Sequence, residues 1–223
     1  MPFALSNSVE HLLGLISRQG GGPGHRILIA LAGLPGSGKS TVTAQLANAV
    51  NSQACAHVMM ALGMDGFHLS KARLSHFPDP TKAFRRRGAP WTFDVVALGQ
   101  PLLDFRERET SVLWPDFEHG VGDPVANAIT VQPSTRIVLI EGLYLLHHDH
   151  GWQCAHLFDK CRFLDVGMEV AMDRLTQRHM AANTQSREVA LQRLAVNDRL
   201  NAEMVLKSRQ HAQWLIENPD QER

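Results

Sequence analysis

The sequence lacks three features that mark particular protein classes: a net charge, a disulfide framework and a long apolar run. Lysine plus arginine and aspartate plus glutamate both number 22, so no overall field attracts nucleic acid or a membrane surface. No stretch approaches the roughly 18 apolar residues of a membrane-spanning helix, and we expect no signal peptide. The 3 cysteines are scattered without a C-x-x-C pair, which is typical of reduced thiols. We therefore expect a cytoplasmic protein that neither binds nucleic acid nor inserts into a membrane.

The rest of the composition is that of an ordinary globular protein. With 223 residues, 44% of them apolar and 20% charged, the chain is long enough for a substantial core, and we expect a single domain over 1–223. Residues 1–25 should form a helix and a glycine-rich break, because apolar residues from Val9 to Ile16 repeat at helical spacing. A homodimer formed through this helix stays an open alternative.

Apolar runs alternate with helical patterns along the remainder of the chain. We expect strands over 26–33, 57–64, 111–115, 136–146, 160–166 and 212–217. We expect helices over 41–50, 94–107, 168–182 and 187–206, and a loop over 76–92. This order predicts an α/β fold with a doubly wound, mainly parallel sheet and flanking helices. Ligands of such sheets bind at the carboxyl ends of the strands.

A glycine-rich loop follows the first of these strands. The stretch "GLPGSGKS", residues 33–40, matches the P-loop pattern G-x-x-x-x-G-K-[ST] between a strand and a helix. Backbone amides and the positive end of the following helix suit phosphate binding. Lys39 is expected to reach the β- and γ-phosphates and Ser40 to bind Mg²⁺. The nucleotide-binding residues are therefore Gly33, Leu34, Pro35, Gly36, Ser37, Gly38, Lys39, Ser40 and Thr41.

Two features that are absent from the sequence narrow the choice of nucleotide and of reaction. A guanine-reading N-K-x-D sequence is absent, and the "NDRL" at 197–200 lies within a helical pattern. The chain is also too short for the insertions of motor or transporter ATPases. Transfer of a phosphoryl group from ATP to a small acceptor is favoured, and it needs a base near the acceptor hydroxyl and positive charge near the γ-phosphate.

Two carboxylates lie at the ends of buried strands, where a catalytic base and a metal ligand are expected. Asp65 comes directly after the second strand, so it should emerge near the γ-phosphate and accept the acceptor's proton. Glu141 ends the most apolar strand, a usual place for the acid that holds Mg²⁺ through water. The alternatives are that Asp65 caps a helix over 67–74 and that Glu141 is only a strand-end cap.

Positive charge near the phosphates is expected from residues 168–206, interpreted as a helical lid and the helix after it. Arg174 and Arg178 are four residues apart and share one helical face, which suits covering a transferring phosphate. A solvent-exposed, salt-bridged face is the alternative. Arg187, at the start of the next helix, could join the pair.

The acceptor should lie between the base and the loop after it. Three adjacent arginines, Arg85 to Arg87, suit an anionic acceptor or form a solvated loop, and Trp91 and Phe117 either stack on a ring or close the loop over the core. The histidines of 147–156 match no closed metal pattern, and a surface cluster is favoured over a zinc site. The expected acceptor residues are Asp65, Phe67, His68, Arg87, Trp91, Phe117 and His119.

Several stretches occur in the order seen in a known group of kinases. They are "GLPGSGKST", "MDGFHL", "RRRGAPWTFD", "PDFEHGVGDP", "IEGLYLL", "DRLTQRH" and "NDRLNA". Over residues 10–217 the chain resembles the uridine kinase, phosphoribulokinase and bacterial pantothenate kinase group, and most of all the branch labelled fructose transport system kinases. It departs from the uridine kinases by having "DGFHL" in place of their tyrosine-bearing acid motif, so their nucleoside contacts do not transfer.

The resemblance implies a P-loop kinase fold that uses ATP and Mg²⁺. It implies that Asp65 is the acceptor-activating base, that Glu141 lies near Mg²⁺, and that Arg174 and Arg178 belong to the lid. Asn197, Asp198 and Asn201 match a family stretch of undefined role.

The leading hypothesis is an ATP- and Mg²⁺-dependent kinase for a small hydroxylated metabolite. The resemblance suggests a sugar such as fructose, while pantothenate-like or nucleoside acceptors stay open. An alternative from another class is a P-loop ATPase switch that regulates a protein partner such as a sugar transporter.

Overall fold

The central feature of the computed structural model is a five-stranded parallel sheet. The structure describes residues 3–18, 26–107, 109–118, 120–183 and 186–217. The strands lie in the order β2-β5-β1-β6-β7, and every neighbouring pair is parallel. Their bounds are β1 Ile27–Gly33, β2 Met59–Gly63, β5 Ile137–Gly142, β6 Lys160–Asp165 and β7 Trp214–Glu217. The mainly parallel α/β sheet with flanking helices is therefore confirmed.

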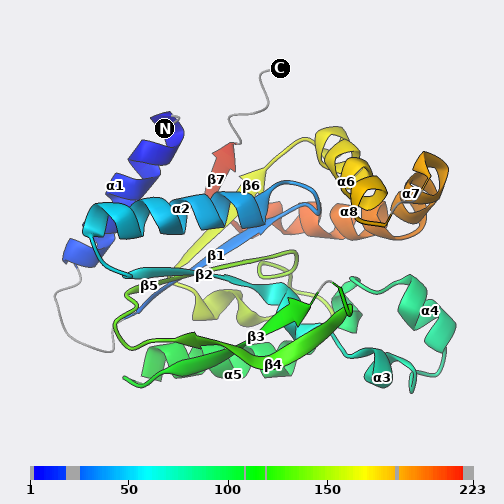
Figure 1. Ribbon diagram of the computed structural model, residues 1–223, viewed down its shortest axis with the longest axis horizontal. Coiled ribbons are helices and arrows are strands. Elements are labelled where there is room, and N and C mark those ends of the chain that lie inside the picture. The colour runs from blue at the N-terminus through cyan, green and yellow to red at the C-terminus, as the bar shows by residue number, and fades with distance from the viewer. Residues whose placement is uncertain (1–2, 19–25, 108, 119, 184–185, 218–223) are drawn as a thin grey trace.

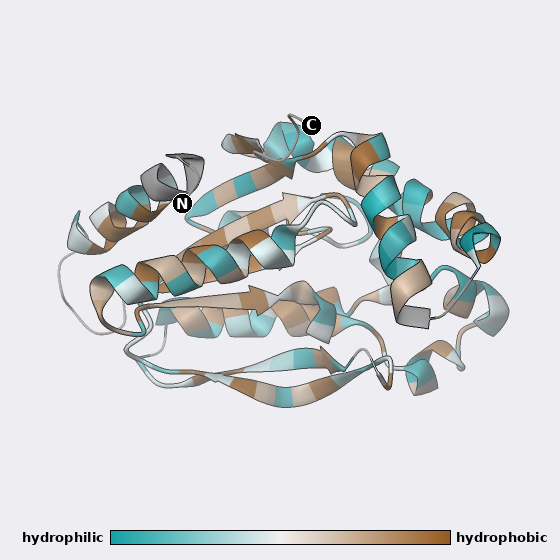
Figure 2. Cartoon of the chain, turned by 45° about the horizontal axis from the view of Figure 1, so that its top comes forward, coloured by the Kyte–Doolittle hydropathy of each residue, from teal (hydrophilic) through white to brown (hydrophobic). Residues whose placement is uncertain are grey.

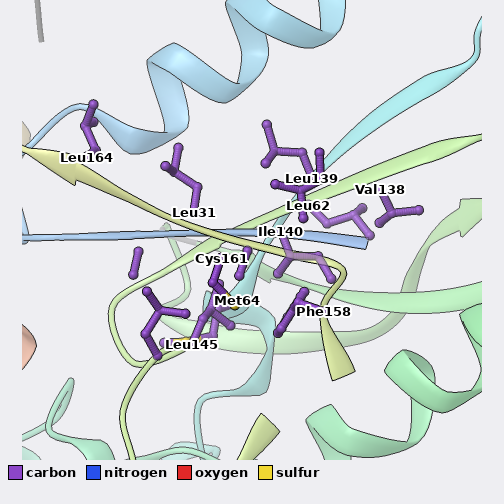
Figure 3. Packing of buried hydrophobic residues seen from close by; sticks show 14 of the residues in the cluster. Leu31, Leu62, Met64, Val138, Leu139, Ile140, Leu145, Phe158, Cys161 and Leu164 are labelled. Carbon is purple, nitrogen blue, oxygen red and sulfur yellow. The ribbon is translucent and has the colours of Figure 1, made fainter. Parts of the chain in front are cut away.

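The inner strands are apolar on both faces because both faces of the sheet are covered. Every residue of β1 is buried, and so are five of the six residues of β5. Leu31 and Leu139 point toward the side of α2 (Figure 3). Ile140 and Cys161 point to the opposite side of the sheet (Figure 3). This two-sided burial explains why these strands appear as continuous apolar runs in the sequence.

The helix α2, Lys39–Ala54, packs over β1, β2 and β5. It also contacts α1, Phe3–Arg18, whose Val9 and Leu12 belong to the core. Apolar colour follows the sheet strands, whereas α2 is mixed around its surface (Figure 2). The helix α5, Val95–Glu107, lies with a separate hairpin on the other side of the molecule (Figure 1). Among the described residues, no helix is long and apolar enough to cross a membrane.

The strand expected over 111–115 exists, but it lies outside the parallel sheet. It belongs to β3, Val112–Glu118, which pairs antiparallel with β4, Asp123–Val131, as a two-stranded sheet. The sequence did not predict β4, because most of its residues are partly or fully exposed and carry no apolar run. The indole of Trp114 donates to the Gly63 carbonyl at 2.9 Å, which fixes the hairpin beside the end of β2.

Two further expectations need correction. The segment 76–92 is not all loop, since it contains α4, Pro80–Arg85, capped by the Asp79 side chain. The helix expected over 187–206 is interrupted: α7, Arg187–Arg193, and α8, Arg199–Lys207, flank a π-helical turn, Leu194–Asp198. Together with α6, Met168–Asn183, and α3, Lys71–Leu74, the helices α4 and α7 gather at one end of the molecule, opposite α1 (Figure 1).

Candidate active site

The loop between β1 and α2 has the geometry of a phosphate cradle. Gly36 and Gly38 have φ angles of 80° and 91°, a region that residues with a Cβ rarely adopt. A Cβ on Gly36 would also lie 2.2 Å from the Ala171 carbonyl oxygen, so α6 packs directly on this loop. The amino end of the 16-residue α2 points its unpaired amides toward the same place.

Lys39 lies at the centre of this cradle and is buried. Its ammonium donates to the carbonyl oxygens of Gly33 at 3.0 Å and Leu34 at 2.9 Å. Burial lowers the pKa of Lys39 below its usual value, and the carboxylates of Glu141 and Asp65 oppose that shift. The sequence separates Lys39 from these two acids, but the fold places all three within electrostatic reach of one another.

Ser40 and Glu141 form the pair of oxygens expected beside a metal. The Ser40 hydroxyl donates to Glu141 Oε1 at 2.7 Å, although the two residues lie 101 positions apart. Glu141 is in register with Leu31 of β1 and Gly63 of β2. Burial raises the pKa of Glu141 above its usual value, while Lys39 and the Ser40 hydrogen bond act against this. Hydroxyl and carboxylate oxygens are the donors that Mg²⁺ prefers, so these residues fit the expected ion.

Asp65 lies in a 3₁₀ turn, Met64–Phe67, that directly follows β2. Its side chain is 51% exposed, and it contributes to the electrostatic environment of both Lys39 and Glu141. The alternative that Asp65 caps a helix over 67–74 is wrong, because α3 begins at Lys71 and the Ser70 side chain caps it. The Asp65 carboxylate is therefore half-exposed, lies within electrostatic reach of the cradle, and is not engaged in capping α3.

The two arginines of α6 reach the same cradle. Arg174 and Arg178 line a pocket of about 290 Å³ whose other walls come from the P-loop: Gly36, Gly38, Lys39, Ser40 and Thr41. The neighbouring acids of α6 have other partners, since Glu169 pairs with Arg199 and Asp173 accepts from Gln177. Arg187 lies elsewhere, in a groove between α6 and α7.

Three of the expected acceptor residues lie together. The His68 ring lies 4.0 Å from that of Phe93 and 4.9 Å from that of Phe117, centroid to centroid, and its Nδ1 lies 2.8 Å from the Asp65 carbonyl oxygen. The guanidinium of Arg87 lies 5.5 Å from the Phe117 ring centroid. His68, Arg87 and Phe117 are thus gathered beside the turn that carries Asp65.

The other expected acceptor residues lie elsewhere or cannot be placed. Phe67 is only 5% exposed and meets Trp114 edge-on at 4.8 Å, as a core side chain does. Trp91 packs against Phe77 in a small separate apolar cluster. His119 lies outside the described residues.

One residue beside this group was not singled out from the sequence. Asp123, at the start of β4, accepts from the Lys71 amide at 2.8 Å and from Arg87 at 2.9 Å. Arg87 also donates to the carbonyl oxygens of Leu69 and Gly122. The charge of Arg87 is therefore engaged in holding the hairpin. The role of Asp123 could have been found from the sequence only if the strand β4 had been predicted, because the pairing of β4 with β3 brings Asp123 beside Arg87.

The histidine-rich stretch after β5 is partly buried. His147 is 6% exposed, and the rings of His148 and His211 meet edge-on at 4.1 Å. In the part of the chain that the structure describes, no group of three or more histidine, cysteine or acidic side chains could hold a metal ion.

Comparison with known proteins agrees with this geometry. Residues 28–217 match the model of the phosphoribulokinase/uridine kinase family. A Schizosaccharomyces pombe protein named "Putative uridine kinase C227.14" is 40% identical over 188 residues, which cover 82% of this chain and 79% of that protein. A structure described as a "putative fructose transport system kinase", from Silicibacter sp. TM1040, is 31% identical with a TM-score of 0.81, covering 93% of this chain and 98% of that one.

A third protein shows that the fold persists at low identity. The YFH7 protein of Saccharomyces cerevisiae is 19% identical, yet it has a TM-score of 0.82 over 96% of this chain and 99% of that one. The family model spans most of the sequence, and the site contains a P-loop together with one acid at the end of each of two strands. The chain is therefore an ATP-dependent kinase that belongs to the phosphoribulokinase/uridine kinase family.

Proposed function

We propose that this kinase transfers the γ-phosphoryl group of ATP to a hydroxyl of a small metabolite, with a sugar as the first acceptor class. The observation that carries the proposal is the position of Asp65 in the turn after β2, at the edge of the sheet where Glu141 lies and close enough to Lys39 and Glu141 to influence the pKa of both. A nucleotide switch needs the cradle but has no use for a half-exposed carboxylate beside it. A base next to a phosphate site is what transfer to a hydroxyl requires.

Each residue of the site has a role in this reaction. The P-loop amides and Lys39 hold the phosphates, and Arg174 and Arg178 cover the transferring group and exclude water. Asp65 orients the acceptor hydroxyl and accepts its proton as the new O–P bond forms and the bond from the γ-phosphorus to the bridging oxygen breaks, which releases ADP. Ser40 and Glu141 would hold Mg²⁺, which supplies charge neutralisation at the phosphate oxygens when bound.

The acceptor would lie between Asp65 and the hairpin β3–β4. His68 and Phe117 supply a ring surface and a polar edge there, which suits a small hydroxylated ring. The description of the Silicibacter protein as a fructose transport system kinase supports a sugar, and the name of the Schizosaccharomyces pombe protein, a uridine kinase, supports a nucleoside. The engagement of Arg87 with Asp123 argues against a dedicated anion clamp at this guanidinium, and so favours an uncharged acceptor.

The direct test is ADP release from ATP and Mg²⁺ across a panel that contains fructose and other sugars, nucleosides and pantothenate. We expect one acceptor class to raise the rate far above hydrolysis without an acceptor, and a sugar to do so first. No stimulation by any small molecule, together with stimulation by a protein partner, would favour the switch instead.

Replacement of the base separates chemistry from binding. Asp65→Asn should lower acceptor-dependent kcat by roughly 10²- to 10⁴-fold, the usual worth of general base catalysis, with little change in ATP affinity. Asp104→Asn is the matched control, because Asp104 lies on α5 and accepts from Gln100 of the same helix. An equal loss of ATP affinity and turnover in Asp65→Asn would contradict the role as base.

A further inference from the structure

The π-helical turn between α7 and α8 and the first turn of α8 carry a cluster of buried polar side chains. Asn197, Asp198 and Asn201 are 4%, 9% and 2% exposed. Buried polar groups are costly unless they are bonded, and π-helical turns are rare and concentrate at functional sites. None of these three residues has a role in the active site described above. Their hydrogen-bond partners therefore indicate what they do.

One partner lies on the arginine-bearing helix α6. His179 Nε2 lies 2.9 Å from the Asp198 carboxylate, and both side chains are buried. His179 directly follows Arg178, which lines the phosphate pocket together with Arg174. Any displacement of α6 over the P-loop therefore acts on the π-helical turn through a buried hydrogen bond.

Further partners lie in the segment 86–92, in addition to Arg193, which pairs with Asp198 at 3.9 Å. Arg86 donates to the carbonyl oxygen of Val196 at 2.9 Å and to Asn201 Oδ1 at 2.9 Å. The Asn197 amide donates back to the Arg87 carbonyl oxygen at 3.0 Å. Because the bonds run in both directions, the segment and the π-helical turn are held as one unit.

The same segment reaches the turn that carries Asp65. The Arg87 side chain donates to the Leu69 carbonyl oxygen at 2.9 Å and lies over Phe117, whose ring faces His68. His68 in turn contacts the Asp65 carbonyl oxygen. A continuous set of contacts thus runs from the phosphate pocket to the opposite side of the site.

We propose that Asn197, Asp198 and Asn201 are positioning residues that couple α6 to the segment 86–92, so that a nucleotide in the phosphate pocket stiffens that segment. Phosphate contacts made by Arg174 and Arg178 fix α6, and the buried bonds of His179 and Arg86 transmit the restraint. The segment 86–92 lies beside the acceptor only if the proposed function is right, because Arg87 contacts Phe117. The coupling itself concerns the nucleotide and the chain alone.

Hydrogen–deuterium exchange with a non-hydrolysable ATP analogue and Mg²⁺, without any acceptor, tests this coupling. In the wild type, the analogue should slow exchange at 33–41 and also at 86–92, the latter by about fivefold or more, as expected for site-to-site coupling. Arg86→Ala should abolish the slowing at 86–92 and leave that at 33–41 intact. Asn201→Ala, which removes an acceptor of Arg86, should do the same, and Arg86→Lys should restore part of the response.

The adjacent arginine provides the control. Arg85 is exposed on α4, so Arg85→Ala should leave the response at 86–92 unchanged. The proposal is overturned if the analogue slows exchange at 33–41 of the wild type but not at 86–92. It is also overturned if exchange at 86–92 is still slowed in Arg86→Ala and Asn201→Ala. Because the assay contains neither acceptor nor turnover, it can succeed when no acceptor is found and fail when one is.

Discussion

At the scale of single residues, the charge of Lys39 has opposite effects on function and on stability. Burial disfavours the charged form and so lowers stability, whereas phosphate binding requires the positive charge. Lys39→Met should therefore leave the midpoint of thermal unfolding at pH 7 no lower than that of the wild type. Nucleotide affinity should fall by roughly 10- to 100-fold, the worth of charged hydrogen bonds.

Calorimetry of unfolding and of nucleotide binding would measure the two effects of Lys39→Met separately. Lys82→Met on the exposed surface of α4 is the control and should alter neither quantity. A large loss of stability in Lys39→Met would show that the bonds to Gly33 and Leu34 outweigh the burial of the charge.

The cysteines give a second prediction at this scale. Burial raises the pKa of the Cys154 thiol to about 12 and also raises that of Cys161, whereas Cys55 is exposed. Because the thiolate is the reactive form, a thiol reagent at pH 8 should modify Cys55 quickly and the other two only after unfolding. Mass spectrometry of labelled peptides would measure this, and fast labelling of Cys154 in the folded protein would contradict it.

At the scale of elements, the contact between α6 and the P-loop depends on one glycine. In Gly36→Ala, the new methyl group would meet the Ala171 carbonyl at a position that also requires a positive φ. We expect a loss of about 1–3 kcal/mol in the free energy of unfolding and a displaced α6 that weakens nucleotide binding. Denaturant unfolding and nucleotide titration would measure both.

Another glycine supplies the control for this substitution. Gly99 lies within α5, and a Cβ there meets no atom within 4 Å. Gly99→Ala should therefore stabilise the protein by about 0.5–1 kcal/mol. Equal effects of the two substitutions would mean that the close approach of α6 to the loop is unimportant.

Elements also show where local sequence patterns stop being informative. The strands β1 and β5 were predictable because burial on both faces leaves a continuous apolar run. The strand β4 was not, because it is largely exposed and is defined by its partner β3. The helical pattern over 187–206 was real, but its interruption at Leu194–Asp198 accompanies bonds from Arg86, far away in sequence.

At the scale of the whole molecule, nucleotide binding should stabilise the folded state by mass action. An ATP analogue with Mg²⁺ at 100 times its dissociation constant contributes about 2.7 kcal/mol, or a rise of roughly 5–10 °C in Tm for a chain of this size. Differential scanning fluorimetry would measure it. Chelation of Mg²⁺ should reduce the shift, since Ser40 and Glu141 would hold this ion and it would neutralise charge on the phosphates.

A variant of Lys39 distinguishes a rise in Tm caused by binding at the cradle from one caused by unspecific binding. Lys39→Met should show a much smaller shift at the same concentration of the analogue. If the shift were the same in the variant, or unaffected by the chelator, the cradle would not be the binding site.

The sequence alone determined the cradle, the class of sheet and the acids that end its strands. These depend on spacing within a few residues, namely the pattern over 33–40 and an acid after a buried run. Only the tertiary structure decided which distant side chains meet: Ser40 with Glu141, Arg87 with Asp123, and Arg86 with Asn201. The physical reason is that residue spacing governs local backbone and burial, whereas a hydrogen bond between residues 115 positions apart exists only once the whole chain has packed.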